Sequence, residues 1–359
     1  MKFGIDGSSI TPSKAGIGYY AFSLIQALQE LDKENEYYIF TNNLENLSEL
    51  NLKDNFQAVE IKSERVNFVW ILQVVNYLKD NHFDSFLSMG NFSFGILYRK
   101  SVQVVHDLAP IKYPQFFTKK GALNYKIQLN LCLKRCKRIL TTSQSVKEEI
   151  EKYKPFTKGK ISVIGFGVHD WVLKESSEED RQVIIEKYNL PKKFFLSVST
   201  LEPRKNHINT IKAFTEFNKD YPEFHYVIVG KKGWFYDEIL KEVETSRAKE
   251  NIHLLGYVSE GDLGALYDLS KGVIMLSFYE GIGLSAMEGT FRGLPVLVSD
   301  IPIFREVVKN NGIFKDPTNL EEILKGLKSL SSAKRKNFVS KNEYNWERCA
   351  IILKETLKA

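Results

Sequence analysis

Short apolar runs alternate with amphipathic segments along the first half of the chain. Each run is bounded by polar or turn-forming residues, and we expect strands at Phe3–Asp6, Tyr37–Thr41, Gln57–Ile61, Phe83–Ser88, Val102–Val105, Ile139–Thr142 and Ile161–Ile164. Between several of them the apolar residues recur with helical spacing, which predicts helices over Gly18–Leu31, Phe68–Leu78, Gly121–Cys136 and Gln144–Tyr153. Strands that alternate with helices favour a parallel sheet covered on both faces.

The alternation stops at residues 174–191, which are highly charged, and then begins again. The second series of expected strands is Phe194–Val198, Tyr226–Val229, His253–Leu255, Val273–Leu276 and Val296–Val298. We therefore expect two doubly wound, Rossmann-like α/β domains, over residues 1–168 and 169–343, with the boundary near 168–192. A last helical pattern covers residues 344–359.

Composition narrows the class of partner. The 359-residue chain is 43% hydrophobic, which is enough to fill two domain cores, and its net charge is +6. That charge suggests an anionic partner, such as a phosphorylated substrate or a lipid surface, and is too small for a dedicated nucleic-acid binder.

Cysteine usage and the distribution of apolar residues suggest a compartment. Three cysteines without framework spacing favour a reducing cytosol, and we interpret Cys132 and Cys136 as ordinary helix residues rather than metal ligands. We expect no signal peptide and no bilayer-spanning helix, because the chain opens on a strand pattern and has no run of about 18 apolar residues. The expected location is the cytoplasm, with the inner face of the membrane as a candidate site of contact.

The stretch KAGIGYYA, residues 14–21, has the Gly-x-Gly-x-x-Ala spacing of a dinucleotide-binding fingerprint, with its glycines at Gly16 and Gly18. That fingerprint follows its strand at once and has an acid about 20 residues on, at the end of the next strand. Here a nine-residue segment separates Asp6 from Gly16, and the next predicted strand ends without an acid, so we set NAD aside. Two interpretations remain: a loop that brings an anion close to a helix N-terminus, or a plain turn.

The segment STLEPRKNH places Arg204 and Lys205 side by side, after the predicted strand Phe194–Val198 and before a helix. A diphosphate there would accept a bidentate arginine contact, a lysine charge and helix amides. Such charge-assisted hydrogen bonds contribute about 1.5–3 kcal/mol each. They would matter for catalysis if they strengthen as a leaving phosphate gains charge. The alternative is a solvated Pro-Arg-Lys turn.

A second candidate segment, SFYEGIGLSAMEG, follows the predicted strand at residues 273–276. Gly283 would let the backbone close on a phosphate at the start of a helix near Leu284. Glu280 would lie beside the group that the phosphate carries, and Glu288 would accept hydrogen bonds from neighbouring hydroxyls such as those of a ribose. Ser285-x-x-Glu288 also fits a capping box, which would give Glu288 a purely structural role.

His106 follows the predicted strand Val102–Val105. Ligands of open α/β sheets bind at the carboxyl ends of strands, where this histidine would hydrogen-bond a sugar hydroxyl. A structural role is the alternative.

Taken together and in order, these segments resemble the retaining glycosyltransferases of family four, which have the GT-B fold. EGIGLSAME matches the family's Glu-x7-Glu pattern, LEPRKN its Arg-Lys element, GIGYY its first-domain glycine loop and VHDL its His-Asp element. VIVGKKGW and LLGYV match segments around the nucleotide, and the match covers nearly the whole chain. The resemblance implies two Rossmann-like domains that face a central crevice. The first would be the acceptor side, completed by the C-terminal helix, and the second would bind the nucleotide sugar.

The resemblance also implies a role for each matching residue. Arg204 and Lys205 would bind the donor diphosphate, and Glu280 and His106 the transferred sugar. The remaining donor contacts would come from Gly16, Gly18, Gly230, Tyr257, Gly283, Leu284 and Glu288, the last of them binding the ribose. One departure is Ser285, where the family usually has proline, and it strengthens the capping-box alternative.

The implied reaction moves a sugar from a nucleotide diphosphate to an acceptor hydroxyl, with retention of configuration and without a metal or other cofactor. LEPRKN and GKKGW are most similar to the mannosyl- and rhamnosyltransferase branch, so GDP-mannose is the first donor candidate. The alternatives are an epimerase or a phosphorylase on the same fold, and a non-catalytic nucleotide-sugar sensor.

The acceptor, a glycan or a lipid-linked glycan of surface polysaccharide assembly, is expected to meet the first domain. The basic helix, here expected over Lys119–Arg138, carries seven basic residues beside apolar ones, and the segment Asn67–Leu78 is unusually apolar. Together they would rest on an anionic membrane, or alternatively combine core packing with a solvated basic face. Asn91–Gly95 is a candidate wall of the acceptor pocket.

Overall fold

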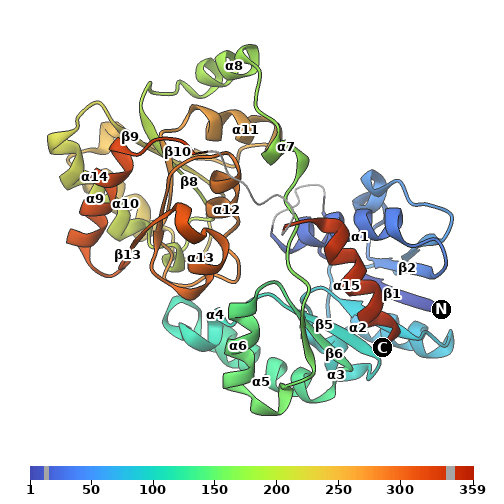
Figure 1. Cartoon of the computed structure of the whole chain (residues 1–359). Helices are drawn as coiled ribbons and strands as arrows, with labels where there is room; N and C mark the ends of the chain where they lie inside the picture. Colours follow the sequence, from blue (N-terminus) through green and yellow to red (C-terminus); the bar gives the residue numbers. More distant parts are fainter. Residues whose placement is uncertain (12–15, 337–343) are drawn as a thin grey trace. The chain divides into compact units, whose positions relative to one another are not determined.

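The computed structural model describes residues 1–11, 16–336 and 344–359. The chain forms two compact units: residues up to Gly167 together with the C-terminal residues 344–359, and residues 168–336. Each unit contains one sheet (Figure 1). The expected α/β class with two parallel sheets is confirmed.

The first sheet has the strand order β3-β2-β1-β4-β5-β6-β7, with every neighbouring pair parallel. Its strands are β1 (Lys2–Asp6), β2 (Glu36–Thr41), β3 (Phe56–Glu60), β4 (Ser85–Ser88), β5 (Ser101–Val105), β6 (Arg138–Thr141) and β7 (Ile161–Val163). Its helices are α1 (Ile17–Leu31), α2 (Phe68–Asp80), α3 (Phe92–Leu97), α4 (Ala109–Lys112), α5 (Lys119–Arg135), α6 (Gln144–Tyr153) and α15 (Trp346–Lys358). All seven expected strands are confirmed. The basic helix is shorter than expected, because Cys136 ends it and Arg138 already belongs to β6.

Helix α15 packs along α1 as part of the first unit (Figure 1). The Trp346 ring lies 4.7 Å from Phe166 and 5.5 Å from Tyr20, measured between ring centroids. Lys354 forms an ion pair of 3.4 Å with the buried Asp32 that follows α1. A Cβ at Gly167 would collide with the Trp346 ring, so this approach requires glycine.

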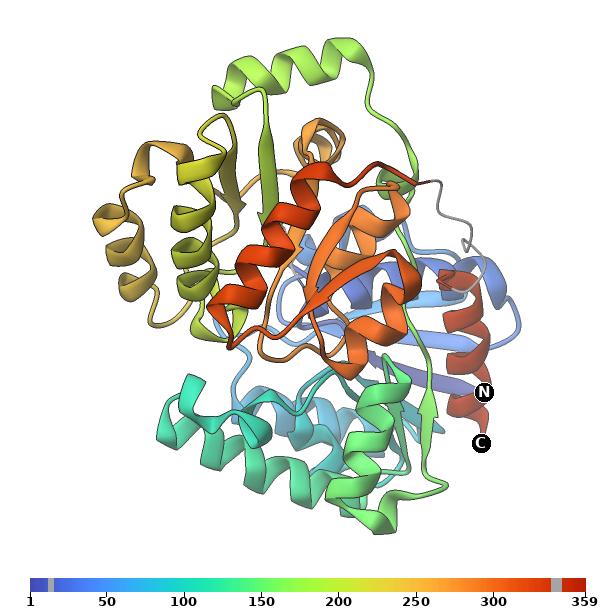
Figure 2. The same cartoon turned by 60° about the vertical axis from the view of Figure 1, so that its left-hand side comes forward.

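The second sheet has the order β10-β9-β8-β11-β12-β13 and is also parallel. Its strands are β8 (Phe194–Val198), β9 (His225–Val229), β10 (Ile252–Gly256), β11 (Gly272–Met275), β12 (Val296–Ser299) and β13 (Gly312–Lys315). Its helices are α7 (Asp170–Leu173), α8 (Glu178–Tyr188), α9 (His207–Asp220), α10 (Asp237–Thr245), α11 (Glu260–Leu269), α12 (Leu284–Phe291), α13 (Pro302–Val307) and α14 (Leu320–Ser332). Helices α9, α10 and α14 pack together on one face (Figure 2). Strand β13 was not expected: it is a half-exposed edge strand of four residues and lacks the apolar run of a buried strand.

The strand orders decide where ligands can bind. In each sheet the order reverses once, between β1 and β4 in the first and between β8 and β11 in the second. Loops that leave the sheet in opposite directions separate at such a point, and the crevice beyond the carboxyl ends of those strands is the preferred ligand site. The loops after β1, β4, β8 and β11 therefore hold the residues of interest.

Among the described residues, no helix has both the length and the apolar character needed to cross a bilayer.

Candidate functional site

The loop after β8 holds Arg204 and Lys205 in a short 3₁₀ turn, Pro203–Lys205. The chain then passes through Asn206 in the left-handed conformation, with φ of 60°, into α9. The Asn206 side chain donates to the Pro317 carbonyl at 2.8 Å, and the Phe278 amide donates to the Arg204 carbonyl at 2.9 Å. These bonds tie the loops after β8, β11 and β13 together and fix the two cations in place.

Arg204 and Lys205 meet two carboxylates, and we call the four residues Glu202, Arg204, Lys205 and Glu280 the Arg-Lys-Glu cluster. Lys205 Nζ lies 2.6 Å from Glu280 Oε1, and Arg204 Nη1 lies 3.1 Å from Glu280 Oε2. Arg204 Nη2 forms an ion pair of 2.6 Å with Glu202, and its Nη1 also donates to the Tyr279 carbonyl. Glu280 is only 7% exposed. The solvated turn that was the alternative for Arg204 and Lys205 is therefore wrong.

Burial and charge compete within this cluster. Burial by itself would raise the pKa of Glu280, but Lys205 and Arg204 lower it to about 2. Burial raises the pKa of the Glu202 carboxyl and lowers the pKa of the Lys205 ammonium. The cluster thus holds two largely buried cations, Arg204 and Lys205, against the carboxylates of Glu202 and Glu280.

Helix α12 begins at Leu284, with Gly283 as its N-cap at φ of 78°. A Cβ at Gly283 would collide with the Phe304 ring of α13, so the position needs glycine for both conformation and space. Ser285 is already inside the helix and donates its hydroxyl to the Val198 carbonyl at the end of β8. The capping-box alternative is wrong, because neither Ser285 nor Glu288 caps this helix.

Glu288 instead accepts a hydrogen bond of 2.6 Å from the Tyr267 hydroxyl on α11. Burial raises the pKa of Glu288 to about 7, against the lowering effect of the Tyr267 bond. One carboxylate oxygen is engaged by Tyr267, and the side chain is half-buried. Tyr267 was not a candidate residue, because nothing in the sequence near it points to α12.

The loops after β9 and β10 present aromatic rings to solvent. Tyr257 is 52% exposed, and the Lys231 ammonium lies 4.6 Å from its ring centroid. Trp234 and Phe235 are also exposed. Gly230 has φ of 156°, and a Cβ there would collide with the Ser199 carbonyl. The expected contact of Tyr257 with the base stays a prediction.

His106 belongs to the first unit, directly after β5. Its Nε2 lies 2.7 Å from the Met89 carbonyl, which can only accept, so Nε2 carries the proton. Burial lowers the pKa of His106, so the ring is neutral at physiological pH with Nδ1 as an acceptor. Its ring meets Tyr20 edge to face, with the centroids 5.2 Å apart.

Gly16 and Gly18 at the start of α1 are explained by local structure. Gly16 has φ of 48° and caps the helix, and a Cβ at Gly18 would collide with the Ser9 carbonyl. Their expected approach to the donor phosphates stays a prediction.

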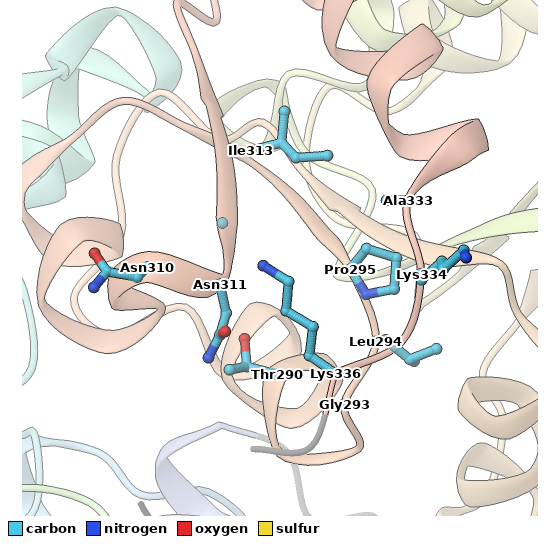
Figure 3. A pocket seen from close by; sticks show the side chains of 11 residues that line it. Thr290, Gly293, Leu294, Pro295, Asn310, Asn311, Ile313, Ala333, Lys334 and Lys336 are labelled. Carbon is cyan, nitrogen blue, oxygen red and sulfur yellow. The ribbon is translucent and has the colours of Figure 1, made fainter. Parts of the chain in front are cut away.

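The structure therefore brings Arg204, Lys205 and Glu280 into direct contact, and places Gly283, Leu284 and Glu288 on the adjacent α12. Cys132 and Cys136 are buried, and within the described ranges no group of three or more His, Cys, Asp or Glu side chains is placed to hold a metal ion. A separate cavity of about 190 Å³ lies around Pro295, Asn311 and Lys336 (Figure 3). It is at the amino ends of β12 and β13, whereas the site residues follow the carboxyl ends of their strands.

Comparisons with known proteins match both halves of the chain. Residues 15–170 match the family model "Glycosyltransferase Family 4", and residues 179–346 match "Glycosyl transferases group 1". The O-antigen chain mannosyltransferase RfbU of Salmonella typhimurium is 28% identical over 256 residues, covering 69% of this chain and 67% of that protein. The serotype-specific mannosyltransferase WbdA of Escherichia coli is 26% identical over 254 residues, 68% of this chain, and the match spans only 31% of WbdA.

Solved structures resemble the whole chain. Anabaena HepE in complex with UDP and glucose has a TM-score of 0.73 at 15% identity, covering 99% of this chain and 95% of that one. Sucrose-phosphate synthase from Thermosynechococcus elongatus has a TM-score of 0.75 at 16% identity, with 99% and 97% covered. At these identities the likeness establishes the shared fold.

Proposed function

The chain belongs to the glycosyltransferases of family four with the GT-B fold, and on that premise we propose that it transfers mannose from GDP-mannose, with retention of configuration. The acceptor is a hydroxyl of a glycan or lipid-linked glycan in surface polysaccharide assembly. The O-antigen and serotype-specific mannosyltransferases among its relatives support mannose as the transferred sugar and support this setting.

The observation that carries the proposal is the Arg-Lys-Glu cluster at the reversal point of the second sheet. An entering diphosphate takes over the donors of Arg204 and Lys205 that now meet Glu280. Glu280 is then free to accept hydrogen bonds from hydroxyls of the donor sugar. As the sugar–phosphate bond breaks, the two cations and the amide end of α12 stabilise the charge that develops on the leaving diphosphate.

The remaining assigned residues hold the rest of the donor. Glu288 accepts hydrogen bonds from the ribose hydroxyls, and the neutral His106 accepts one at Nδ1 from the sugar. Tyr257 stacks on the base. An oxygen of the donor phosphate takes the proton of the acceptor hydroxyl. The positive charge that balances the negative charge of the diphosphate comes from protein side chains.

We further propose that the first unit rests on an anionic membrane through α5. Leu123, Ile127 and Leu131 recur at every fourth position of this helix and are 59%, 50% and 44% exposed. Five basic side chains belong to the same helix: Lys119, Lys120, Lys126, Lys134 and Arg135. An apolar stripe flanked by lysines is typical of a helix that lies in a membrane interface.

Nucleotide binding tests the proposal first. Purified protein is heated with GDP, UDP, dTDP, ADP or NAD, and a ligand at about 100 times its Kd should stabilise by about 2.7 kcal/mol. GDP should raise the Tm of the parent and of Arg247→Ala, an exposed arginine of the same unit, by clearly more than it raises the Tm of Arg204→Ala. A response to NAD alone would refute the assignment.

Transfer is measured with GDP-mannose, and the anomeric configuration of the product by NMR. Glu280→Ala and Arg204→Ala should both abolish turnover. Sugar-nucleotide consumption without any acceptor would favour an epimerase instead. For the membrane, Leu123→Asp should reduce sedimentation with vesicles containing phosphatidylglycerol, whereas Val183→Asp, equally exposed on α8, should not.

A further inference from the structure

A second cavity lies within the first unit, at the reversal point of its sheet. Its volume is about 470 Å³, within the range of about 300–1,000 Å³ typical of small-molecule sites. The loops after β1 and β4 form one side and helix α5 the other. We call it the β1–β4 cavity, and the lining residues used below are Asp6, Asn91, Phe92, Asn124, Tyr125 and Gln128.

Asp6 places a buried carboxylate in this wall. It ends β1 and is only 2% exposed. Its Oδ1 accepts from the Ser8 amide at 3.1 Å and from the Ser8 hydroxyl at 2.6 Å, and the Met89 amide also donates to it. Burial raises the pKa of Asp6, against the lowering effect of the hydrogen bonds from Ser8 and Met89. Among the described residues, the partners of Asp6 are neutral donors, and none of those that line the cavity is a lysine or an arginine. A buried carboxyl with neutral partners offers hydrogen bonds to hydroxyl groups, and a wall of described residues without a lysine or an arginine provides no charge partner for an anionic ligand.

Two aromatic rings form an apolar part of the wall. Phe92 and Tyr125 meet edge to face, with their centroids 5.1 Å apart. The Tyr125 hydroxyl donates to the Asp107 carbonyl at 2.7 Å, which fixes the ring. Rigid rings beside polar groups suit the C–H face of a sugar, because they bury its apolar side at little cost in conformational entropy.

Side-chain amides supply both donors and acceptors. Asn91 uses its Oδ1 to cap α3, accepting from Ser93 at 3.1 Å, which turns its NH₂ group to other partners. Gln128 donates to Asn124 Oδ1 at 3.2 Å, so the pair presents the Gln128 oxygen and the Asn124 NH₂ group. Neighbouring donors and acceptors match the vicinal hydroxyls of a sugar ring.

We propose that the β1–β4 cavity binds the acceptor, and that the acceptor group it takes is an uncharged sugar ring rather than a phosphate-bearing or carboxylate-bearing group. The inference rests on the proposed transferase function and specifies its acceptor. The backbone of Met89 connects the cavity to His106, the residue assigned to the donor sugar. Its N–H donates to Asp6, and its carbonyl accepts from His106.

Saturation-transfer NMR tests this without knowledge of the natural acceptor. The probes are methyl α-mannoside, methyl α-glucoside, methyl α-galactoside, mannose 6-phosphate and glycerol 1-phosphate, each offered to the protein saturated with GDP. At least one methyl glycoside should give a signal, and neither phosphate should. Asp6→Asn and Gln128→Ala should weaken that glycoside at least tenfold. Gln182→Ala should not, since this exposed glutamine makes the same kind of i,i+4 contact on α8 in the second unit.

The outcomes separate the two proposals. Stabilisation by GDP reports on the second unit, whereas thermal unfolding of Asp6→Asn and Gln128→Ala that matches the parent in the absence of ligand shows that the first unit of those variants is folded. Loss of GDP binding in the parent refutes the proposed function, and the sugar probes are then read on the unliganded protein. Binding of the phosphates alone, binding of no glycoside, or glycoside binding that survives Asp6→Asn overturns the inference about the acceptor.

Discussion

The affinity for the nucleotide should depend on pH through Glu288. This carboxyl is half ionised near neutral pH, because burial raises its pKa to about 7. Only the carboxylate can accept hydrogen bonds from two ribose hydroxyls, since a protonated carboxyl has given up acceptor capacity to its own proton. Raising the pH through 7 should therefore strengthen binding of a nucleoside diphosphate.

The size of the effect follows from that pKa. If only the ionised protein binds, the apparent Kd scales with one plus the ratio of protonated to ionised Glu288. This ratio is about 10 at pH 6 and about 0.1 at pH 8, so the Kd should fall about tenfold over this interval. A tenfold change corresponds to about 1.4 kcal/mol. Tyr267→Phe should move the midpoint to higher pH, because the tyrosine hydroxyl bond lowers the pKa of Glu288.

Isothermal titration calorimetry with GDP at pH 6, 7 and 8 measures this dependence. The terminal phosphate of GDP also titrates, with a pKa of about 6, so the matched control is Glu288→Gln, which retains only that contribution. A second control is 2′-deoxy-GDP, for which the part due to Glu288 should be smaller. If the parent and Glu288→Gln show the same dependence on pH, the contact between Glu288 and ribose is wrong.

Three further predictions concern the second unit and the helix start at Gly16. Arg204→Ala should weaken GDP binding by about 1.5–3 kcal/mol and abolish transfer. Arg204→Lys should be intermediate, because lysine keeps the charge but cannot make the bidentate guanidinium contact. Turnover that survives in the alanine variant contradicts the diphosphate contact. Glu280→Gln should lower the free energy of unfolding at pH 7 by about 3 kcal/mol, the equivalent of a pKa lowered from 4.5 to about 2. This contribution should disappear as the pH falls from 4.5 towards 2. Urea titration of both proteins measures the difference, and equal stabilities at pH 7 would be the contrary result. Gly283→Ala should destabilise more than Gly16→Ala by thermal unfolding, because both residues have positive φ but only at Gly283 does a Cβ strike the Phe304 ring; equal losses would remove the steric argument.

Most of the fold was accessible from the sequence because parallel strands buried on both faces are continuous apolar runs. Twelve expected strands are present, and the one that was missed, β13, is short, half-exposed and at the sheet edge. The end of α5 was placed too late, since Lys137 and Arg138 continue the basic pattern although the chain has already turned into β6. Composition and periodicity carry no information about such a turn.

The candidate site was accessible only in part. Sequence motifs singled out Arg204, Lys205 and Glu280. For Ser285 and Glu288, local spacing also offered a capping box as the alternative to ribose binding, and that box does not form. Their true partners are the Val198 carbonyl and the Tyr267 hydroxyl, which lie 87 and 21 residues away in the chain. No local pattern indicates such contacts, because they arise from how β8, α11 and α12 pack.

The sequence by itself determined the two α/β halves and the types of side chain available at the ends of their strands. Only the tertiary structure decided what those side chains do. Glu280 and Glu288 are identical residues in one short segment, yet their pKa values move in opposite directions, to about 2 and about 7. Glu280 meets two cations delivered by a loop 75 residues earlier, whereas Glu288 is surrounded by packed side chains and meets one neutral hydroxyl. Charge placed by folding, rather than residue type, sets the chemistry of each carboxylate.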